Sequence, residues 1–212
     1  MTQYKPMANM SRFWDRHAKG YAKRPVADEA AYRQKLKVTQ NYLKPDMEVL
    51  EFGCGTGTTA LIQAPFVKHI LATDISGGML EIARAKAAAQ GVGNVTFQQV
   101  SIEELDAPDA SFDVVMGHSI LHLLQDRKAA IAKVHRMLRP GGAFVTSTAC
   151  LAGKMAWLRV VLPVGRFFGL LPLVKFLSAE ELVADMTRAG FRIDHQSRHG
   201  KSGSAFLVAV KE

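Results

Sequence analysis

The chain has 212 residues, of which 48% are hydrophobic and 22% charged, values that fit one folded domain and exclude disordered and collagen-like chains. Its net charge of +8 is concentrated in two segments: residues 1–37 carry nine basic and three acidic side chains, and residues 151–177 carry four basic side chains and no acidic one. Residues 38–150 have a net charge of −2. A nucleic-acid-binding protein more often spreads its basic residues over its main domain, so we expect no nucleic-acid partner.

The period of the apolar residues predicts an alternation of strands and helices. In chain order it predicts a helical arm over 1–43, a strand over 47–52, a helix over 58–66, a strand over 69–73, a helix over 76–90, strands over 95–100 and 112–116, a helix over 126–138, a strand over 143–148, an apolar insertion over 151–177, a helix that begins at Ser178, and strands over 191–195 and 205–210.

Capping residues support several of these boundaries. Ser76 is expected to cap the start of its helix and Gly91 to follow its end. Glu181 lies three residues after Ser178, which is the spacing of a capping box. The run Pro140-Gly141-Gly142 is expected to end the 126–138 helix and to form a turn before the next strand.

The βαβ spacing from residue 47 to residue 148 predicts an α/β fold with a doubly wound, mainly parallel sheet and helices on both faces. The last two strands are expected to form an antiparallel hairpin, which brings the sheet to seven strands. We expect a single domain over 1–212, with the arm at 1–43, a core at 44–150, the insertion at 151–177, and a C-terminal helix and strands at 178–212.

Cysteine content and hydropathy bear on metal binding and location. Cys54 and Cys150 are too few for a disulfide framework or, by themselves, for a four-ligand zinc site, and we expect no metal. The N-terminal residues lack the apolar segment of a signal peptide, and charged residues and prolines interrupt the most apolar stretch. We therefore expect a cytoplasmic protein.

The sharpest motif is the run from Glu51 to Gly57, in which Gly53, Gly55 and Gly57 alternate after a strand and before a helix. Glycines at such a turn let the backbone approach a ligand closely. A dinucleotide motif would need a glycine at position 58, where the chain has Thr58, so the spacing is wrong for NAD. An acid before the glycines favours a cationic ligand group, and Asp74, at the end of the next strand, could accept hydrogen bonds from a ribose diol.

At these residues the sequence resembles the class I S-adenosylmethionine-dependent methyltransferases, most closely the small-molecule branch with the quinone-biosynthesis and phospholipid N-methyltransferases. The resemblance covers roughly residues 13–150 and rests on five ordered blocks: Glu51–Gly57, Asp74-Ile75, Ser101–Leu105, Phe112–Val115 with Leu121–Leu123, and Leu138–Gly142. It implies a Rossmann-like fold and the cofactor S-adenosylmethionine. The residues that it implies for binding the cofactor are Tyr21, Glu51, Gly53, Cys54, Gly55, Thr56, Gly57, Asp74, Ile75, Met79, Ser101, Ile102 and His118.

Some residues depart from the family pattern or leave alternatives open. Ser101 replaces the aspartate that usually accepts from the adenine amino group, so we expect that contact to be weaker. His118 faces the cofactor or acceptor, or is a packed core histidine, and His122, one turn later, is catalytic or a helix-surface residue. Tyr21, and less so Trp14, are expected to close over the cofactor from the arm. Cys150 is expected to fill a small apolar role.

The insertion over 154–177 is apolar and punctuated only by basic residues. Three interpretations remain open: a helical lid packed on the sheet, an element that makes peripheral contact with a membrane or admits a lipid-like acceptor, and a dimer contact.

The predicted function is methyl transfer from S-adenosylmethionine to a small, hydrophobic or anionic acceptor, by a monomer or homodimer. Nucleic-acid and protein N-methylating relatives carry an N/D-P-P-F/Y motif, and this chain has His118-Ser119-Ile120-Leu121 at that place. A nucleic-acid or protein methyltransferase is therefore the second enzymatic interpretation. A catalytically silent S-adenosylmethionine-binding or membrane-associated module is the alternative outside enzymes.

Overall fold

The computed structural model describes residues 5–148, 150, 177–199 and 204–212. The predicted insertion at 151–177 lies outside these residues except for Leu177, which is fully buried. The three interpretations of the insertion therefore stay predictions. No described helix is both long enough and apolar enough to cross a lipid bilayer.

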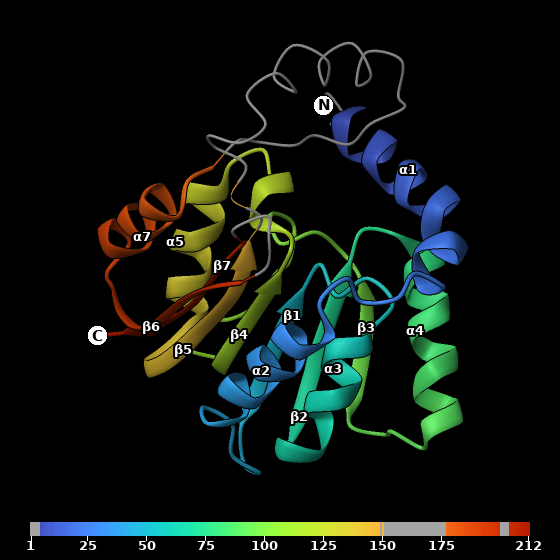
Figure 1. Cartoon of the computed structure of the whole chain (residues 1–212), viewed down its shortest axis with the longest axis horizontal. Coiled ribbons are helices and arrows are strands. Elements are labelled where there is room, and N and C mark those ends of the chain that lie inside the picture. Colours follow the sequence, from blue (N-terminus) through green and yellow to red (C-terminus); the bar gives the residue numbers. More distant parts are fainter. Residues whose placement is uncertain (1–4, 149, 151–176, 200–203) are drawn as a thin grey trace.

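The described strands form a seven-stranded sheet, which confirms the predicted fold class (Figure 1). Their order is β3-β2-β1-β4-β5-β7-β6. The first five are parallel, and β7 is antiparallel to both β5 and β6. The strands are β1 (Glu48–Phe52), β2 (His69–Asp74), β3 (Val95–Gln99), β4 (Phe112–His118), β5 (Leu138–Thr148), β6 (Phe191–His199) and β7 (Ser204–Lys211).

Helices cover both faces of this sheet (Figure 1). The helices are α1 (Lys5–Ala22), α2 (Glu29–Gln40), α3 (Thr58–Gln63), α4 (Gly77–Gln90), α5 (Arg127–Met137) and α7 (Ala179–Arg188), with 3₁₀ turns η1 (Ala64–Phe66) and η2 (Leu121–Leu123). The apolar residues of α2, α3 and α4 pack on one face and those of α5 and α7 on the other. Helix α1 packs on α4 at the edge of the molecule.

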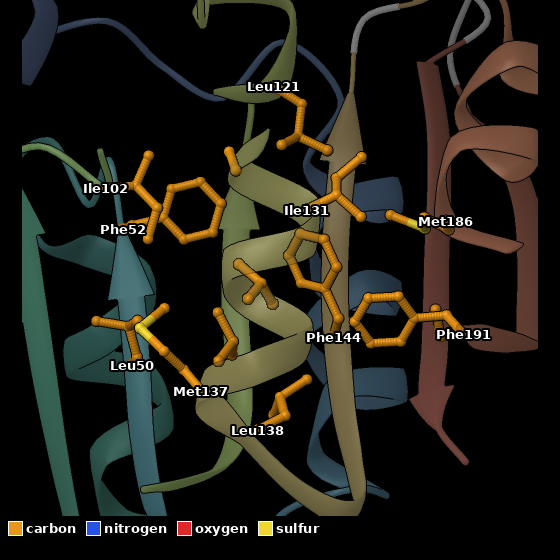
Figure 2. Close-up of a cluster of buried hydrophobic side chains, with 14 of the residues drawn as sticks. Leu50, Phe52, Ile102, Leu121, Ile131, Met137, Leu138, Phe144, Met186 and Phe191 are labelled. Carbon is orange, nitrogen blue, oxygen red and sulfur yellow. The ribbon is translucent and has the colours of Figure 1, made fainter. Parts of the chain in front are cut away.

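Two hydrophobic clusters follow from the alternation of side chains along the strands. In β1, Val49 points to the cluster under α2–α4, whereas Leu50 and Phe52 point to the cluster under α5 and α7. Figure 2 shows the second cluster, in which the rings of Phe52, Phe144 and Phe191 follow one another across the sheet. The ring centroids lie 6.2 Å apart for Phe52 and Phe144 and 5.9 Å apart for Phe144 and Phe191. The clusters fix the strands whose carboxyl ends carry the site.

Local capping explains where the helices begin and end. Ser76 accepts a hydrogen bond from the Met79 N–H at 3.1 Å and caps α4, which ends at Gly91 in a left-handed conformation. Ser178 and Glu181 form the expected capping box at the start of α7.

The Pro140-Gly141-Gly142 run differs from its prediction as a turn. Helix α5 ends at Met137, and β5 begins at once at Leu138, so the run lies inside the strand beside a bulge in the β4–β5 pairing. Gly141 has φ +77°, and a Cβ on Gly142 would lie 2.8 Å from the Arg139 carbonyl oxygen. Glycine is needed here to bend a strand rather than to separate two elements.

Candidate functional site

Polar residues form a row across the carboxyl ends of four neighbouring strands. The β1–β2 register pairs Phe52 with Thr73, so the next residues, Gly53 and Asp74, lie level. The β1–β4 register pairs Glu51 with Met116, which brings His118 to the same level, and His118 pairs with Ser147 of β5. The chain reverses its direction of winding between β1 and β4, which is where open parallel sheets bind ligands.

The glycine loop after β1 has three residues in the left-handed region, at φ +66° for Gly53, +55° for Gly55 and +72° for Gly57. A Cβ on Gly53 would lie 2.7 Å from Ile120, and one on Gly57 would lie 2.8 Å from Ala83, so these two glycines are needed for packing. Among the described residues, a Cβ on Gly55 would meet only the Tyr21 ring, at 4.0 Å. Gly55 is therefore the point of the loop that leaves space for a ligand.

Glu51 lies near the end of β1 and is buried, with 2% of its surface exposed, and its charge acts on Tyr21, whose ring lies beside Gly55. Within the described part of the chain, its Oε2 atom has no hydrogen-bond partner. Burial raises the pKa of the Glu51 carboxyl to about 8, against a hydrogen bond from the Ala60 backbone that lowers it, and the nearby charge of Asp74 raises it further. An unpaired buried carboxyl of this kind is suited to a cationic or hydrogen-bond-donating ligand group.

Asp74 joins the glycine loop to the start of α4. Its two carboxylate oxygens accept from the backbone N–H groups of Gly55, at 2.8 Å, and Ser76, at 2.9 Å. Burial raises the pKa of Asp74, and these backbone donors act in the opposite direction. Each oxygen keeps a second lone pair with which it could accept from a hydroxyl group of a ligand.

Helix α1 brings two residues to the same place. The Tyr21 ring lies beside Gly55, and it is 45% exposed in the described structure. Burial of its hydroxyl raises the pKa of Tyr21, and the charge of Asp74 adds to this effect. Trp14 packs edge-to-face on Tyr21, with 6.3 Å between ring centroids.

Asp15 is a third residue that α1 contributes. Its Oδ1 atom accepts from the Ser76 hydroxyl at 2.6 Å and from the Gly78 N–H at 3.0 Å. A carboxylate at this position caps the N-terminus of α4, where the helix dipole favours negative charge. Asp15 therefore ties the N-terminal arm to the wall of the site.

His118, Ser147 and Lys35 form the other half of the row. The Lys35 Nζ atom, on α2, donates to the Ser147 hydroxyl at 3.0 Å. Burial lowers the pKa of His118 to about 4, and the positive charge of Lys35 lowers it further. His118 is therefore neutral at physiological pH, and one of its ring nitrogens carries a proton while the other is free to accept.

The other residues predicted to bind the cofactor near the glycine loop and α4 differ in how far they are buried. Cys54, Thr56 and Met79 are buried around the glycine loop and the start of α4, and Ile75 is half-buried. Burial raises the pKa of the Cys54 thiol well above its usual value, so the thiol is not a nucleophile. Thr56 accepts a hydrogen bond from the Lys86 ammonium at 3.0 Å.

Ser101, Ile102 and His122 lie near the ends of β3 and β4. The Ser101 hydroxyl accepts from the Glu104 N–H at 3.1 Å, so it is already engaged within its own turn. Ile102 packs in the cluster of Figure 2. The Nδ1 atom of His122 is buried without a partner among the described residues, and burial lowers the pKa of the ring. No described hydrogen bond joins His122 to the row of strand ends.

Sequence reasoning did not single out Asp15, Tyr32, Lys35 or Lys86. Tyr32 hydrogen-bonds the Thr59 hydroxyl at 3.1 Å and thereby fixes α2 on α3 beside the glycine loop. Lys35 lies 112 residues before its partner Ser147, and nothing in the sequence around it distinguishes it from Lys37. The one signal for Asp15 in the sequence is that it is the single acidic residue of the segment from Trp14 to Tyr21.

Comparison with known proteins agrees with this geometry. Residues 49–142 match the family model described as a methyltransferase domain. The chain is 36% identical over 102 residues to the uncharacterized methyltransferase YcgJ of Bacillus subtilis, a match that covers 48% of this chain and 40% of YcgJ. The crystal structure of YcgJ superposes with a TM-score of 0.70 at 20% identity, covering 85% of this chain and 99% of that one.

Two further relatives have more informative names. The malonyl-[acyl-carrier protein] O-methyltransferase of Serratia marcescens is 32% identical over 121 residues, covering 55% of this chain and 45% of that protein. The demethylmenaquinone methyltransferase of Symbiobacterium thermophilum is 31% identical over 129 residues, a match that covers 58% of this chain and 49% of that protein. The chain thus matches about half the length of these curated relatives.

Proposed function

Since residues 49–142 match a methyltransferase domain, we propose that the chain is a class I S-adenosylmethionine-dependent methyltransferase. It transfers the methyl group of that cofactor to a small acceptor that is hydrophobic or anionic. The observation that carries the proposal is the open space at Gly55, bordered by two buried carboxyl groups, Glu51 and Asp74. A cofactor with an ammonium group, a sulfonium and a ribose diol offers positive charge and donors to such a pair.

The residues of this chain suit that cofactor. The unpaired Oε2 atom of Glu51 would receive a donor from the cationic methionine part, and the free lone pairs of Asp74 would accept from the ribose hydroxyls. Gly55 would allow close approach of the loop, and the Tyr21 ring would cover the same space from α1. Ile75 and Met79 would border the adenine, and the engaged hydroxyl of Ser101 would leave that ring to backbone contacts.

The bound cofactor supplies an electrophilic methyl group on a positively charged sulfur. The protein contributes alignment and exclusion of water, which together can account for most of the rate of such a displacement. His118 faces the acceptor side of the site, but a base with a pKa of about 4 removes a proton only weakly at neutral pH. We therefore propose that the acceptor reaches the site already ionised, or needs no deprotonation.

The acceptor class is supported by the names of relatives and by charge. One relative is named for O-methylation of a malonyl group and another for a demethylmenaquinone, so both act on small or carrier-bound groups rather than on nucleic acid. The exposed basic side chains of α1, among them Arg16 and Lys19, would attract an anionic acceptor.

The same charges support a peripheral membrane contact by the protein. The arm and the segment over 154–177 carry the basic surplus of the chain, and each basic residue near an anionic lipid surface contributes about 1 kcal/mol. Co-sedimentation with anionic and zwitterionic vesicles at low and high salt tests this part. We expect salt-sensitive binding to anionic vesicles that is lost when Arg159 and Arg166 are changed to Gln. Absence of binding to both vesicle types would contradict the membrane contact.

The experiment that tests the main proposal has two steps. Calorimetric titration with S-adenosylmethionine should show one site, and absence of binding would refute the proposal. Transfer of an isotope-labelled methyl group into a cell extract, separated into lipid, aqueous and macromolecular fractions, should then label the lipid or aqueous fraction. Label in the macromolecular fraction would favour a nucleic-acid or protein methyltransferase. Binding without any transfer would favour a catalytically silent binding module.

A further inference from the structure

A lysine, a serine and a histidine meet beyond the glycine loop, at the carboxyl ends of β4 and β5. His118 and Ser147 are paired residues of the two strands, so their side chains lie on the same face of the sheet, the one that α2 covers. Lys35 reaches them from α2 and donates to the Ser147 hydroxyl at 3.0 Å. The positive charge of Lys35 acts directly on the His118 ring.

Lys35 is held in this place by the packing of its helix. The Tyr32 hydroxyl bonds Thr59 at 3.1 Å, and the Gln63 side chain donates to the Leu36 carbonyl at 3.2 Å, so two bonds join α2 to α3 on either side of Lys35. Because α2 is fixed on α3, the Lys35 ammonium can move into solvent only by breaking its hydrogen bond to Ser147.

The ammonium group of Lys35 has hydrogen-bonding capacity that the described chain does not use. It carries three donors, and the described residues supply one acceptor, the Ser147 hydroxyl. No carboxylate in the described ranges lies within ion-pair distance of Nζ, although the charge of Asp28 acts on it from farther away. Burial lowers the pKa of Lys35, as expected for a cation that has lost water without gaining a counter-ion. A ligand anion would supply that counter-ion.

The polarity of the row changes between its two halves. Glu51 and Asp74, at the ends of β1 and β2, are acidic and suit the cationic cofactor. At the ends of β4 and β5, the Lys35 ammonium that reaches in from α2 offers a positive charge, and His118 offers a neutral ring with one N–H donor. A ligand that lies beside the cofactor on this second half therefore meets donors and a cation, and no described carboxylate.

We propose that Lys35, His118 and Ser147 bind an anionic oxygen of the methyl acceptor, such as a carboxylate or phenolate oxygen. Lys35 forms a charge-assisted hydrogen bond to that oxygen, His118 donates its ring N–H, and Ser147 holds the ammonium group in position. This inference rests on the proposed function, because it assigns the anion to the acceptor of that same site. It makes Lys35 a determinant of specificity, since a neutral acceptor would leave the half-buried ammonium without a counter-ion.

The test uses 4-nitrophenol as an optical probe, because its phenolate absorbs visible light and its phenol form does not. The probe is titrated at about pH 6, where it is mostly a phenol in solution, with and without S-adenosylhomocysteine. We expect the wild-type protein to bind the phenolate and to increase the visible absorbance. We expect Lys35→Met to weaken this binding by about tenfold or more and Lys35→Arg to retain most of it. Ser147→Ala should weaken it severalfold.

Lys37→Met is the matched control, because Lys37 lies on the same helix and is exposed. It should leave the titration unchanged, and melting curves of each variant report whether it folds. In a competition with the probe, benzoate should displace it better than the isosteric but neutral benzamide, and Lys35→Met should remove that difference. Equal displacement by the two in the wild type, or the same titration in the wild type and Lys35→Met, would overturn the inference.

Calorimetry with S-adenosylmethionine on the same variants separates this inference from the proposed function. We expect Lys35→Met to bind the cofactor like the wild type. Failure of the wild type to bind cofactor would contradict the proposed function, and with it the assignment of the anion to a methyl acceptor, whereas the titration without S-adenosylhomocysteine would still test the anion site itself. Normal cofactor binding with no dependence of the probe on Lys35 would contradict the present inference alone.

Discussion

Asp74 acts in two ways with a single side chain. It fixes the glycine loop through the Gly55 N–H and the start of α4 through the Ser76 N–H. Replacing it with alanine should weaken the binding of S-adenosylmethionine by about 1.5–3 kcal/mol, because hydrogen bonds to a charged group are lost. Asp126→Ala is the control, since Asp126 accepts from the Ala129 N–H at 3.0 Å and caps α5, which packs on the opposite face of the sheet from α4. It should lower stability by about 0.5–2 kcal/mol and leave affinity unchanged.

Gly55 and Gly91 form a matched pair for testing the loop. Both have positive φ, +55° and +66°, and neither has an atom closer than 4.0 Å to the position of a Cβ. Valine at either position should therefore impose similar backbone strain. We expect Gly55→Val to abolish cofactor binding by calorimetry, and Gly91→Val to bind normally. Equal effects of the two substitutions would mean that strain, rather than occupation of the site, explains the loss.

Glu51 should make the stability of the free protein depend on pH. The carboxyl has a folded-state pKa of about 8 against an ordinary value of 4.5, so between these values the folded state binds more protons than the unfolded state. The free energy of unfolding should therefore fall as pH rises through this window, and Glu51→Gln should flatten the dependence. Urea titrations at several pH values measure it, with the exposed Glu81→Gln as control. A slope unchanged by Glu51→Gln would contradict the assignment.

Among the elements, α5 and α7 are joined by one buried carboxylate. The Asp185 side chain is 3% exposed and accepts at 2.8 Å from both Arg127 of α5 and Arg188 of its own helix. Asp185→Ala should lower the free energy of unfolding by about 1–3 kcal/mol, because Arg127 then loses its partner in a poorly hydrated place.

Asp109→Ala is the comparison for that change. Asp109 also pairs with an arginine at 2.8 Å, but both side chains are more than half exposed. Its loss should cost less than about 1 kcal/mol because solvent screens the pair. Chemical denaturation of both variants gives the two values, and equal costs would show that burial does not set the strength of the α5–α7 link.

Most elements could be predicted from sequence because local signals mark them. The strands from β1 to β4 end at polar or glycine residues, and Ser76, Gly91 and Ser178 mark helix ends by their own chemistry. The predicted start of β5, at residue 143, was wrong because a Pro-Gly-Gly run has the composition of a turn, whereas the strand begins at Leu138. The strand begins earlier because Leu138 already pairs with Phe112 of β4, after which the pairing skips the run and resumes between Ala143 and Val114. That pattern depends on residues far away in the chain.

Across the whole molecule, the site joins segments that are far apart in sequence. The glycine loop and Asp74 could be predicted because each follows a strand that the sequence identifies. Lys35 could not, because its partner Ser147 is 112 residues away and its helix also carries Lys37. Asp15 is the one acid of α1, but its partner Ser76 is 61 residues away, so the sequence does not show what it contacts. A residue's place on a packed helix depends on the crossing of that helix over the sheet, which short-range patterns do not contain.

Cofactor binding should stabilise the whole domain, since the residues proposed to bind it come from α1, β1, β2 and α4. At a concentration of S-adenosylmethionine about 100 times its Kd, the gain is about 2.7 kcal/mol. For a chain of this length, that should raise Tm by about 5–10 °C. Scanning fluorimetry measures the shift, and Asp74→Ala should show a smaller one at the same cofactor concentration. No shift in the wild type would contradict cofactor binding by the folded state.

The hydrogen bond from the Gly78 N–H to Asp15 makes hydrogen exchange at this amide a measure of how α1 moves on α4. This amide exchanges its hydrogen with solvent only while Asp15 is away, because the first amides of a helix have no partner within the helix itself. Where reclosing is faster than exchange, its exchange rate therefore reports the fraction of time for which Asp15 has left this amide. If Tyr21 covers the cofactor, a lifted arm is also the moment at which used cofactor can leave. A substitution that loosens this bond would then speed both hydrogen exchange at Gly78 and the release of used cofactor.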